Sequence, residues 1–515
     1  MKLKRVLALT LSAAILILCA GCTGKKTSNN ENSNKLSWWI GMNAVVGQSA
    51  SNYGETPIYK EVQKQTGIEI EFVHPVVGQE TQQFNIMVAS GELPDIITYD
   101  ITAYNGGAVR AIADKVIIPL NDLMKKHAPN LTKVLNENPQ WDKSVKLDDG
   151  TYFTVPMLCG DETLRCWSGP QIRKDLLDKA GLPVPETIEE WDTTLRAFKD
   201  MGIEAPFSLP KVISTSAIFV GAFGVNSGYY MNDGVVKYGE IEPEFKDFLT
   251  LVSGWYKDGL LNKEYFVEDG KTYDSKVSTG KVGAFVSGAG GGMGKFIPAL
   301  EKNVPGATLV AAPFPVMNKG DIPEFGFIRP EYDPTLGSYI SSKCSNPELA
   351  MKLLDFGYSE KGHMVYNFGT EGESYEMIDG YPKYTELITN NPDGMTMPNA
   401  IAIHCAATIG GPFVKDSRYY EQYLEMPQQK EAVKIWANQN NDHILPALHL
   451  TDEESAQLLE ISNTLKTYVD ENVTKFIIGQ KPMSQYDKFV EEIKAMGVEK
   501  GIAVYQAALD RYNKR

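Results

Sequence analysis

The chain has 515 residues, of which 43% are hydrophobic and 22% charged, an ordinary composition for a folded protein of two or more domains. Its 65 acidic and 50 basic residues give a net charge of −15, which disfavours nucleic acids and anionic lipid surfaces as partners. Six cysteines are too few for a disulfide scaffold. Cys159 and Cys166 are close enough in sequence to bridge a loop, although buried free thiols are the favoured state.

The first 35 residues have the features of an export signal followed by a lipid attachment site. Basic residues open the chain, and residues 6–18 form an apolar run that is too short to span a bilayer. Small residues precede Cys22, so we expect residues 1–21 to be removed and Cys22 to carry the lipid. The alternative is an ordinary signal peptide, with Cys22 left as a free thiol. The polar residues 22–35 predict a flexible tether, which would hold a folded body at the extracellular face of the cell membrane.

The first part of this body alternates strands and helices. An apolar run at 36–40, a period-two pattern at 68–73 and an apolar segment at 93–99 predict strands. Residues 56–67 and 81–90 predict helices, each stopped by a glycine. Strands that alternate with helices indicate a parallel sheet that is covered on both faces.

Residues that follow the strands of such a sheet are candidates for ligand binding, because ligands bind beyond the carboxyl ends of the strands. This rule selects Trp38, Trp39, Asn43, Tyr99 and Asp100. The two tryptophans are adjacent in a strand and therefore point to opposite faces. We expect one of them in the core, while the other is either a core residue or a flat surface for a ligand.

The rest of the chain predicts a second α/β block and a helical end. The second block extends from about residue 171 to residue 294. Its predicted helices lie at 174–181, 188–201 and 243–259, and its predicted strand lies at 282–287. From residue 306 to residue 355 the chain returns to alternating strand and helix. Residues 451–515 are almost wholly helical in pattern, and they begin with a capping box at Thr451.

Several short motifs, in this order along the chain, resemble one family. They are Val88-Ala-Ser-Gly-Glu-Leu-Pro-Asp-Ile96, Ile172-Arg-Lys-Asp-Leu-Leu-Asp-Lys-Ala-Gly-Leu182, Thr279-Gly-Lys-Val-Gly283, Asn346-Pro-Glu348 and Gly369-Thr-Glu-Gly-Glu-Ser-Tyr375. Together they resemble the extracellular solute-binding proteins, family 1, of ABC importers. Within that family the chain is most similar to the large lipoproteins of oligosaccharide and polysaccharide importers, such as alginate-binding proteins.

The resemblance implies an α/β fold of the periplasmic-binding-protein type, with two lobes, a hinge, an interlobe cleft and a helical C-terminal extension. Lobe one would contain residues 36–157 and 320–400, and lobe two residues 158–319 and 401–515. A monomer would trap its ligand in the cleft and deliver it to a membrane permease. Relatives of the alginate-binding type carry a calcium loop that matches residues 199–206. This segment offers too few oxygen ligands, so we expect no calcium there and no other cofactor.

Capture of a sugar needs flat aromatic rings and hydrogen-bonding side chains in a preformed cleft. The further candidates of this kind are Arg165, Trp167, Tyr229, Arg329, Glu371, Glu373 and Tyr375. Trp167 lies, by resemblance, where the chain crosses between the lobes, and we expect it to contact the ligand. An exposed loop is the alternative for Tyr229, and a structural turn is the alternative for residues 369–375. An acidic ligand would require basic residues such as Arg165 and Arg329 to converge.

Sequence patterns typical of enzymes are weak. The six histidines form no His-Glu-x-x-His pair, there is no nucleophile elbow, and the glycine run at 287–294 fails the dinucleotide-binding spacing. Its glycines are instead expected to let the backbone approach a ligand closely. The sequence therefore predicts a non-catalytic receptor for an oligosaccharide. A peptide receptor, a secreted glycan-degrading enzyme and an adhesin without a small ligand stay open as alternatives.

Overall fold

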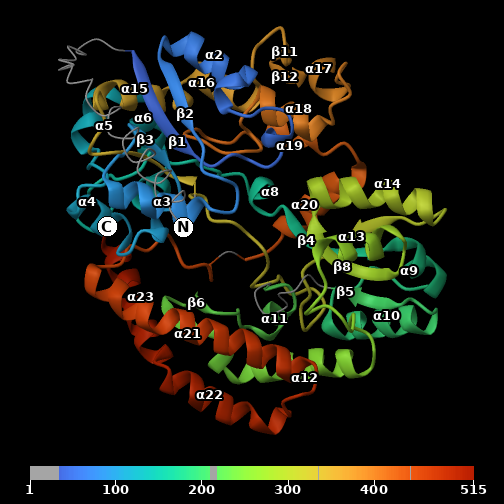
Figure 1. Cartoon of the computed structure of the whole chain (residues 1–515). Helices are drawn as coiled ribbons and strands as arrows, with labels where there is room; N and C mark the ends of the chain where they lie inside the picture. The colour runs from blue at the N-terminus through green and yellow to red at the C-terminus, as the bar shows by residue number, and fades with distance from the viewer. Residues whose placement is uncertain (1–33, 209–216, 334–335, 441) are drawn as a thin grey trace, which may run out of the picture. The chain divides into compact units, whose positions relative to one another are not determined.

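A computed structural model describes residues 34–208, 217–333, 336–440 and 442–515 (Figure 1). The expected signal peptide, nearly all of the tether and the expected lipidation site Cys22 lie outside the described residues. None of the described helices is long and apolar enough to cross a membrane. The described part contains two four-stranded sheets, each packed against its own large hydrophobic core.

The first sheet has the strand order β10-β3-β1-β2. Its strands are β1 (Lys35–Ile40), β2 (Glu69–Val73), β3 (Ile96–Thr98) and β10 (Ser338–Ile340). β1 and β3 run parallel, whereas β10 pairs with β3 in the antiparallel sense. The parallel sheet predicted for residues 36–99 is confirmed for β1 and β3, and β10, which lies outside that range, adds an antiparallel edge strand. This strand arrives from a distant part of the chain and not through a helical crossover, so no local connection constrains its direction.

Helices and one hairpin complete the half of the molecule that contains the first sheet. The helices that precede the second sheet in sequence are α2 (Pro57–Thr66), α3 (Glu80–Ser90), α4 (Gly107–Ala113), α5 (Asn121–His127), α6 (Pro129–Glu137) and α7 (Pro139–Ser144). Those that follow it are α15 (Pro347–Asp355), α16 (Glu360–Phe368), α17 (Glu386–Thr389) and α18 (Met397–His404), with the hairpin of β11 (Tyr375–Ile378) and β12 (Tyr381–Tyr384). The predicted α2 ends at Gly67, whose φ of 68° favours glycine.

The two faces of the first sheet are both covered, as predicted. Trp38 points to one face, where its ring packs against Tyr59 of α2. Trp39 points to the other face, where its ring packs against Phe84 of α3. The two tryptophans also belong to different hydrophobic clusters. This confirms that adjacent residues of the strand point in opposite directions.

The second sheet has the order β5-β8-β4-β9. Its strands are β4 (Ser168–Arg173), β5 (Ala205–Ser208), β8 (Val282–Gly288) and β9 (Leu309–Ala311). β4 is antiparallel to both β8 and β9, while β5 and β8 run parallel. The helices of this half are α8 (Glu162–Arg165), α9 (Lys174–Ala180), α10 (Ile188–Asp200), α11 (Ala217–Val220), α12 (Pro243–Lys257), α13 (Gly270–Ser278), α14 (Gly294–Asn303), α19 (Ser417–Tyr423) and α20 (Pro427–Ala437).

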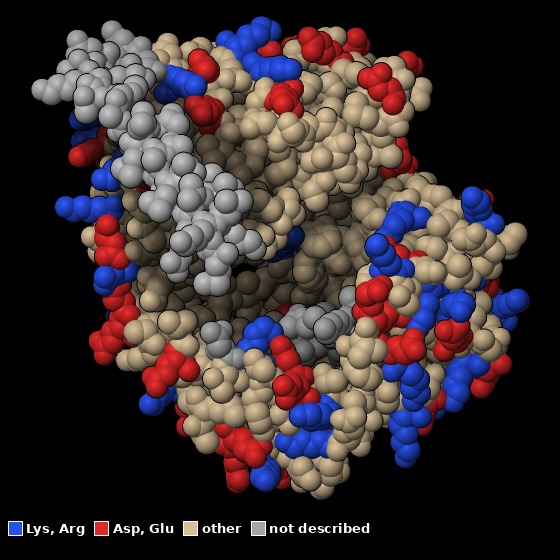
Figure 2. All heavy atoms as spheres, in the orientation of Figure 1, with Lys and Arg blue, Asp and Glu red and all other residues tan. Residues whose placement is uncertain are grey.

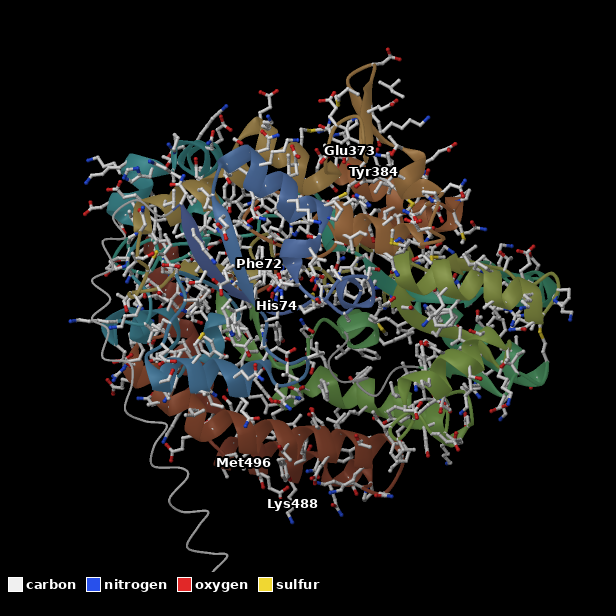
Figure 3. All side chains as sticks on the ribbon, turned by 45° about the horizontal axis from the view of Figure 1, so that its top comes forward. Phe72, His74, Glu373, Tyr384, Lys488 and Met496 are labelled. Carbon is white, nitrogen blue, oxygen red and sulfur yellow. The ribbon has the colours of Figure 1, made fainter. Side chains whose placement is uncertain are left out.

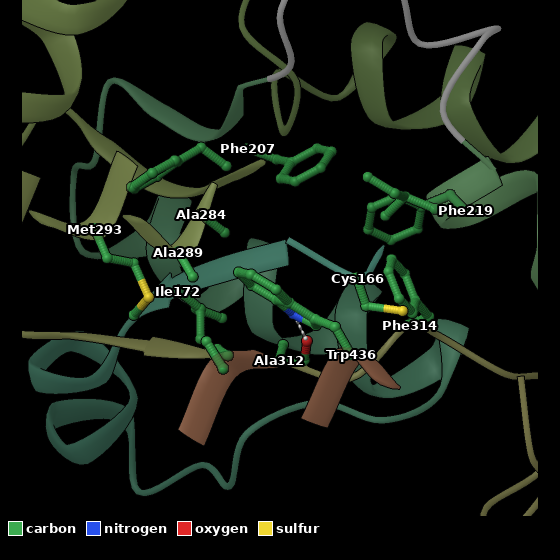
Figure 4. Packing of buried hydrophobic residues seen from close by; sticks show 14 of the residues in the cluster. Cys166, Ile172, Phe207, Phe219, Ala284, Ala289, Met293, Ala312, Phe314 and Trp436 are labelled. Carbon is green, nitrogen blue, oxygen red and sulfur yellow. Dashed lines mark hydrogen bonds between the residues drawn. The ribbon is translucent and has the colours of Figure 1, made fainter. Parts of the chain in front are cut away.

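A helix from late in the sequence fills the core of the second sheet. Figure 4 shows Trp436 of α20 among the buried side chains, with its Nε1 donating to the carbonyl oxygen of Ala312 at 3.0 Å. A Cβ atom on Gly169 of β4 would lie 2.4 Å from that Nε1, so only glycine leaves room for the indole. The chain therefore returns to the second half after it has completed the first.

Three extended segments connect the halves and bond to one another; we call residues 157–159, 331–333 and 413–415 the crossing ladder. The Leu158 amide donates to the carbonyl of Phe413 (3.0 Å), and the Lys415 amide donates to the carbonyl of Leu158 (2.8 Å). The Cys159 amide donates to the carbonyl of Glu331 (2.9 Å). Leu158 belongs to the core of the first sheet and Cys159 to that of the second, so the chain passes from one core to the other between consecutive residues.

The helical end of the chain forms a second connection between the halves. It consists of α21 (Asp452–Ile477), α22 (Tyr486–Ala495) and α23 (Val498–Lys514), which confirms the predicted helical end and its capping box. α21 packs on α12, and α23 packs on β7 (Val235–Tyr238) of the hairpin with β6 (Tyr229–Asn232). Arg511 and Arg515 at the end of the chain also pair with Asp148 of the first half, and Arg511 pairs with Glu454 of α21. We call these four residues the charged clasp.

Candidate functional site

The face drawn in Figure 2 is hollowed, and atoms of Lys or Arg are visible inside the hollow. In the shared orientation of Figures 1 and 2, the hollow lies between the half with the first sheet and the elements β6 and α11. The sequence predicted ligand-binding residues in and after β1 and β3, at Arg165, Trp167 and Arg329 near the crossing ladder, at Tyr229, and between Glu371 and Tyr375. Their side chains differ widely in how much surface they offer.

The tryptophans of β1 offer almost no surface to a ligand in this structure. Trp38 is fully buried, and its Nε1 donates to Thr98 Oγ1 at 2.8 Å. Trp39 is 4% exposed, and the ring of Tyr99 stands edge-on against it with 5.4 Å between the ring centroids. Tyr99 itself is half-buried, and its hydroxyl lies 2.7 Å from Thr81 Oγ1. Of these three aromatic residues, Tyr99 is the one that presents a surface.

The polar candidates after the strands are engaged in local turns. Asn43 Oδ1 accepts a hydrogen bond from the Val45 amide at 2.8 Å. Asp100 Oδ1 accepts from both the amide and the hydroxyl of Thr102, and so caps a short 3₁₀ helix, Ile101–Ala103. Both side chains are half-buried, so each retains some exposed surface beside its turn. These contacts are typical of Asn and Asp in turns and do not by themselves point to a ligand.

An aromatic and basic cluster lies where the crossing segments enter the second sheet. The guanidinium carbon of Arg329 is 4.9 Å from the centroid of the Trp167 ring, a cation–π contact. Phe327 packs edge-on against the same ring at 5.1 Å. Arg165 Nε donates to the carbonyl of Arg329 at 2.7 Å, and Arg165 pairs with Glu331 at 3.5 Å. The structure thus brings three of the predicted residues, Arg165, Trp167 and Arg329, into one cluster.

The indole nitrogen of Trp167 is buried and has no hydrogen-bond partner among the described residues. A buried N–H that lacks an acceptor costs free energy, so such groups are usually paired. The ring is only partly buried, and it is held from below by the backbone of Gly288, where a Cβ atom would lie 3.1 Å from Trp167 Cε3. Trp167 is therefore a fixed aromatic surface with one donor left unused.

The glycine run after β8 admits aromatic rings of the protein itself. A Cβ atom on Gly290 would lie 2.3 Å from Tyr423 Cε1. Tyr423 in turn stacks on Tyr420 of the same helix, α19, with 5.8 Å between the ring centroids. At Gly290 the close approach is to Tyr423 of the protein itself, and the predicted approach to a ligand stays a prediction. Sequence reasoning missed Tyr420 and Tyr423, although the Arg-Tyr-Tyr-Glu-Gln-Tyr pattern of 418–423 marks an aromatic helix face.

Tyr229 lies outside this cluster. Its ring packs against Tyr238 of the partner strand and Tyr505 of α23, at centroid distances of 4.8 Å and 4.5 Å. Burial raises the pKa of its hydroxyl, which has no hydrogen-bond partner among the described residues. Tyr229 therefore fixes the helical end to the second half, and it is neither the exposed loop residue nor the cleft residue that the sequence suggested.

The candidates from residues 369–375 also lie outside the cluster. Glu371 and Glu373 are exposed, and Tyr375 is buried against Phe368. Figure 3 shows Glu373 and Tyr384 on the side of the β11–β12 hairpin, apart from Phe72 and His74 at the end of β2. Glu371 and Tyr375 line a cavity of about 800 Å³ beside the crossing ladder. The alternative of a structural turn describes this segment well, since Ser374 Oγ donates to the Phe368 carbonyl at 2.7 Å.

A second cavity was not predicted from the sequence. It has a volume of about 540 Å³ and lies between the 3₁₀ helix after Asp100 and the loop that precedes α21. Tyr104 lines it from the first half, and Leu448, Leu458 and Tyr505 line it from the helical end. The apolar sequence of residues 445–450 is the one signal that marks this loop as more than a connection.

The described residues offer little for metal or nucleophilic chemistry. No group of three or more His, Cys, Asp or Glu side chains in the described ranges could hold a metal ion. Cys159 and Cys166 are free and buried. Burial raises the pKa of Cys159 to about 11 and that of Cys166 to about 12, so both thiols are protonated at neutral pH. The predicted absence of a cofactor stays a prediction.

Known proteins share this architecture. A model of the bacterial extracellular solute-binding protein family matches residues 50–364. The chain belongs to this family. It is 24% identical to the fructooligosaccharide ABC transporter substrate-binding protein FusA of Streptococcus pneumoniae serotype 4, over 92% of this chain and 90% of FusA. It is 26% identical to lipoprotein LipO of Bacillus subtilis strain 168, over 96% of each chain. The crystal structure of the alginate-binding protein AlgQ2 without calcium ion has a TM-score of 0.73, at 24% identity over 92% of this chain and 98% of that one.

As a solute-binding protein, the chain has the two-lobe α/β fold that its sequence predicted. The two sheets with their cores are the lobes, and the crossing ladder is the place where the chain changes from one to the other. The lobe boundaries that the sequence suggested stay a prediction. Residues 401–515 in particular contribute to both halves, because the charged clasp ties them to Asp148.

Proposed function

We propose that this solute-binding protein is the receptor of an ABC importer, that it binds an oligosaccharide between its lobes, and that it hands the sugar unaltered to the permease. The observation that carries the proposal is the Trp167 cluster at the hinge. A partly exposed indole beside a guanidinium and the carboxylate of Glu331 combines an apolar face for the C–H groups of a sugar with polar groups for its hydroxyls.

The relatives support this choice of ligand and partner. FusA is named for fructooligosaccharide transport and AlgQ2 for alginate binding, so both are named for carbohydrate ligands. The ligand would stabilise a closed form of the two lobes by binding it more tightly than the open form. The lipoprotein LipO and the expected processing at Cys22 support a receptor that is anchored by lipid to the extracellular face of the membrane. We propose that the receptor acts as a monomer.

A thermal-shift screen of the full-length protein against oligosaccharides and short peptides tests the proposal, with chromatography of each hit for cleavage. We expect a rise in melting temperature that depends on sugar concentration, since binding to the native state alone adds about 2.7 kcal/mol of stability at a ligand concentration of 100 Kd. The sugar should be recovered intact. Stabilisation by peptides alone would replace the proposal with a peptide receptor, and cleaved sugar would replace it with an enzyme.

A further inference from the structure

The crossing ladder divides its side chains between the two lobes. Leu158 bridges to Tyr332 on one side and to Val414 on the other, and all three side chains pack in or against the core of the first sheet. Successive side chains of an extended segment point to opposite faces. Cys159 and Lys415, each one residue further on, therefore face away from that core and toward the second lobe.

Lys415 interacts electrostatically with the guanidinium of Arg329 and with the carboxylate of Asp333 at this face. Lys415 and Arg329 are close enough to repel each other electrostatically, and each also acts on the Cys159 thiol. Burial lowers the pKa of Lys415; Cys159 and Asp333 act in the opposite direction. Within the described ranges, neither Lys415 nor Arg329 has a carboxylate at ion-pair distance, in contrast to Arg165, which pairs with Glu331.

Three polar groups near the crossing ladder donate hydrogen bonds and accept none, and the acceptors beside them are the carboxylates of Glu331 and Asp333. The Lys415 ammonium, the Arg329 guanidinium and the indole N–H of Trp167 are donors only. The Trp167 donor is buried without a partner among the described residues, and the Arg329 guanidinium lies over the ring of the same residue. An ionised carboxylate is the complementary group, since it accepts only, and its charge would offset the repulsion between the two cations.

We propose that the ligand is an acidic oligosaccharide and that Lys415 and Arg329 hold one of its carboxylates above the crossing ladder. This inference rests on the proposed function and narrows its ligand class to sugars that contain uronic acids or similar acidic groups. The exposed part of Trp167 would contact the sugar ring that carries the carboxylate. Asp333 and Glu331, the nearby carboxylates, would accept hydrogen bonds from the hydroxyls of the same sugar.

The test uses the full-length protein and two pools of short oligosaccharides. One pool is prepared from acidic polysaccharides and the other from neutral ones. Each acidic hit is measured again by calorimetry after its carboxylates have been converted to methyl esters. We expect binding from the acidic pool, a loss of about tenfold or more in affinity on esterification, and a further fall in affinity as salt is added.

Two variants assign the effect to the proposed residues. Lys415→Met and Arg329→Gln should each weaken the acidic hit by about tenfold or more and leave its methyl ester unaffected. Lys257→Met is the control, because this exposed lysine lies at the end of α12 and should change neither affinity. Melting temperatures of all variants without ligand show whether they fold. Lys415→Arg, which keeps the charge, should retain most of the affinity if Lys415→Met proves unstable.

The outcomes separate the inference from the function on which it rests. Binding from the neutral pool alone, with affinities that Lys415→Met and Arg329→Gln do not change, would overturn the acidic ligand and leave the oligosaccharide receptor in place. Binding from neither pool would overturn both. Acidic hits that bind equally well as methyl esters would also overturn the role of the two cations.

Discussion

The two connections between the lobes are built from different interactions. The crossing ladder uses backbone hydrogen bonds of 2.8–3.0 Å, and its side chains Leu158 and Tyr332 are almost completely buried. The charged clasp uses ion pairs between side chains, with Arg511 and Arg515 each 2.5–2.6 Å from Asp148. Buried backbone bonds respond little to salt or pH, whereas ion pairs near the surface respond to both.

This difference suggests different roles for the two connections. Consecutive residues of the ladder belong to different cores, so a bend there moves one lobe relative to the other while each side chain stays in its own core. The charged clasp lies at the end of α23, and its ion pairs to Asp148 must break or rearrange if the two lobes move apart there. We therefore expect the ladder to set the stability of the protein and the clasp to set how readily the lobes move.

The largest expected effect on stability is at the ladder. Leu158→Ala removes a fully buried side chain from the core of the first sheet. It should lower the free energy of unfolding by about 2–5 kcal/mol, the range for buried leucine truncated to alanine. Urea denaturation followed by circular dichroism measures this. Ile86→Ala, on the exposed face of α3, is the control and should cost far less. If Leu158→Ala and Ile86→Ala lower the free energy of unfolding equally, Leu158 contributes no more to stability than an exposed side chain does.

The next effect concerns binding and not stability. Trp167→Ala removes the aromatic surface at the ladder and should cost about 1–3 kcal/mol of binding free energy for whichever oligosaccharide the screen identifies. Trp167→Phe keeps an aromatic ring but removes the unpaired N–H, so its loss should be smaller. Calorimetry gives both numbers. An unchanged affinity in Trp167→Ala would remove this residue from the site.

At the clasp, Asp148→Asn removes the carboxylate that two arginines share. Arg515 is 5% exposed and would lose its charged partner, while Arg511 would keep Glu454. Hydrogen bonds between charged groups contribute about 1.5–3 kcal/mol, and partial exposure reduces this, so we expect a loss of about 1–2 kcal/mol. Asp487→Asn removes the exposed partner of Lys246 and serves as the matched control. If both variants lose the same stability, the clasp is an ordinary surface contact.

The clasp should also make stability depend on pH. Burial alone would raise the pKa of Asp148, but hydrogen bonds from Arg511 and Arg515 outweigh it and lower the pKa; the pKa of Glu454 is lowered for the same reasons by Arg511. A carboxylate with a lowered folded-state pKa stabilises the protein above its unfolded pKa, about 4, and this contribution is lost as the pH falls through the lower folded value. Unfolding midpoints measured from pH 7 to pH 3 should therefore fall less steeply in Asp148→Asn. If the unfolding midpoints of Asp148→Asn and of the unmodified protein fall equally steeply, the charged clasp is not the source of the pH dependence.

The sequence predicted local structure well and distant pairings only in part. Alternation at 68–73 and the glycine after 56–66 were enough to place β2 and α2, because these signals are local. The period of a strand also placed Trp38 and Trp39 on opposite faces, and the alternation of strands with helices predicted that both faces are covered. Lys415 carried no local signal. Its place depends on backbone bonds to Leu158, more than 250 residues away in the chain.

The smallest expected effect is that of calcium on the segment after α10. Here Arg196 bonds both Asp192 (2.8 Å) and Asp258 (3.0 Å), and Lys199 Nζ donates to the Asp258 carbonyl at 2.5 Å. Within residues 199–206, Glu204 pairs with Lys281 at 3.0 Å, and the neighbouring carboxylates of Asp192 and Asp258 are held by Arg196. A divalent ion would have to displace these fixed cations. Melting temperatures in calcium and in EDTA should be the same, since a ligand that does not bind the native state does not stabilise it. Arg196→Met should lower the melting temperature equally in both buffers; rescue by calcium would show that the segment retains a metal site.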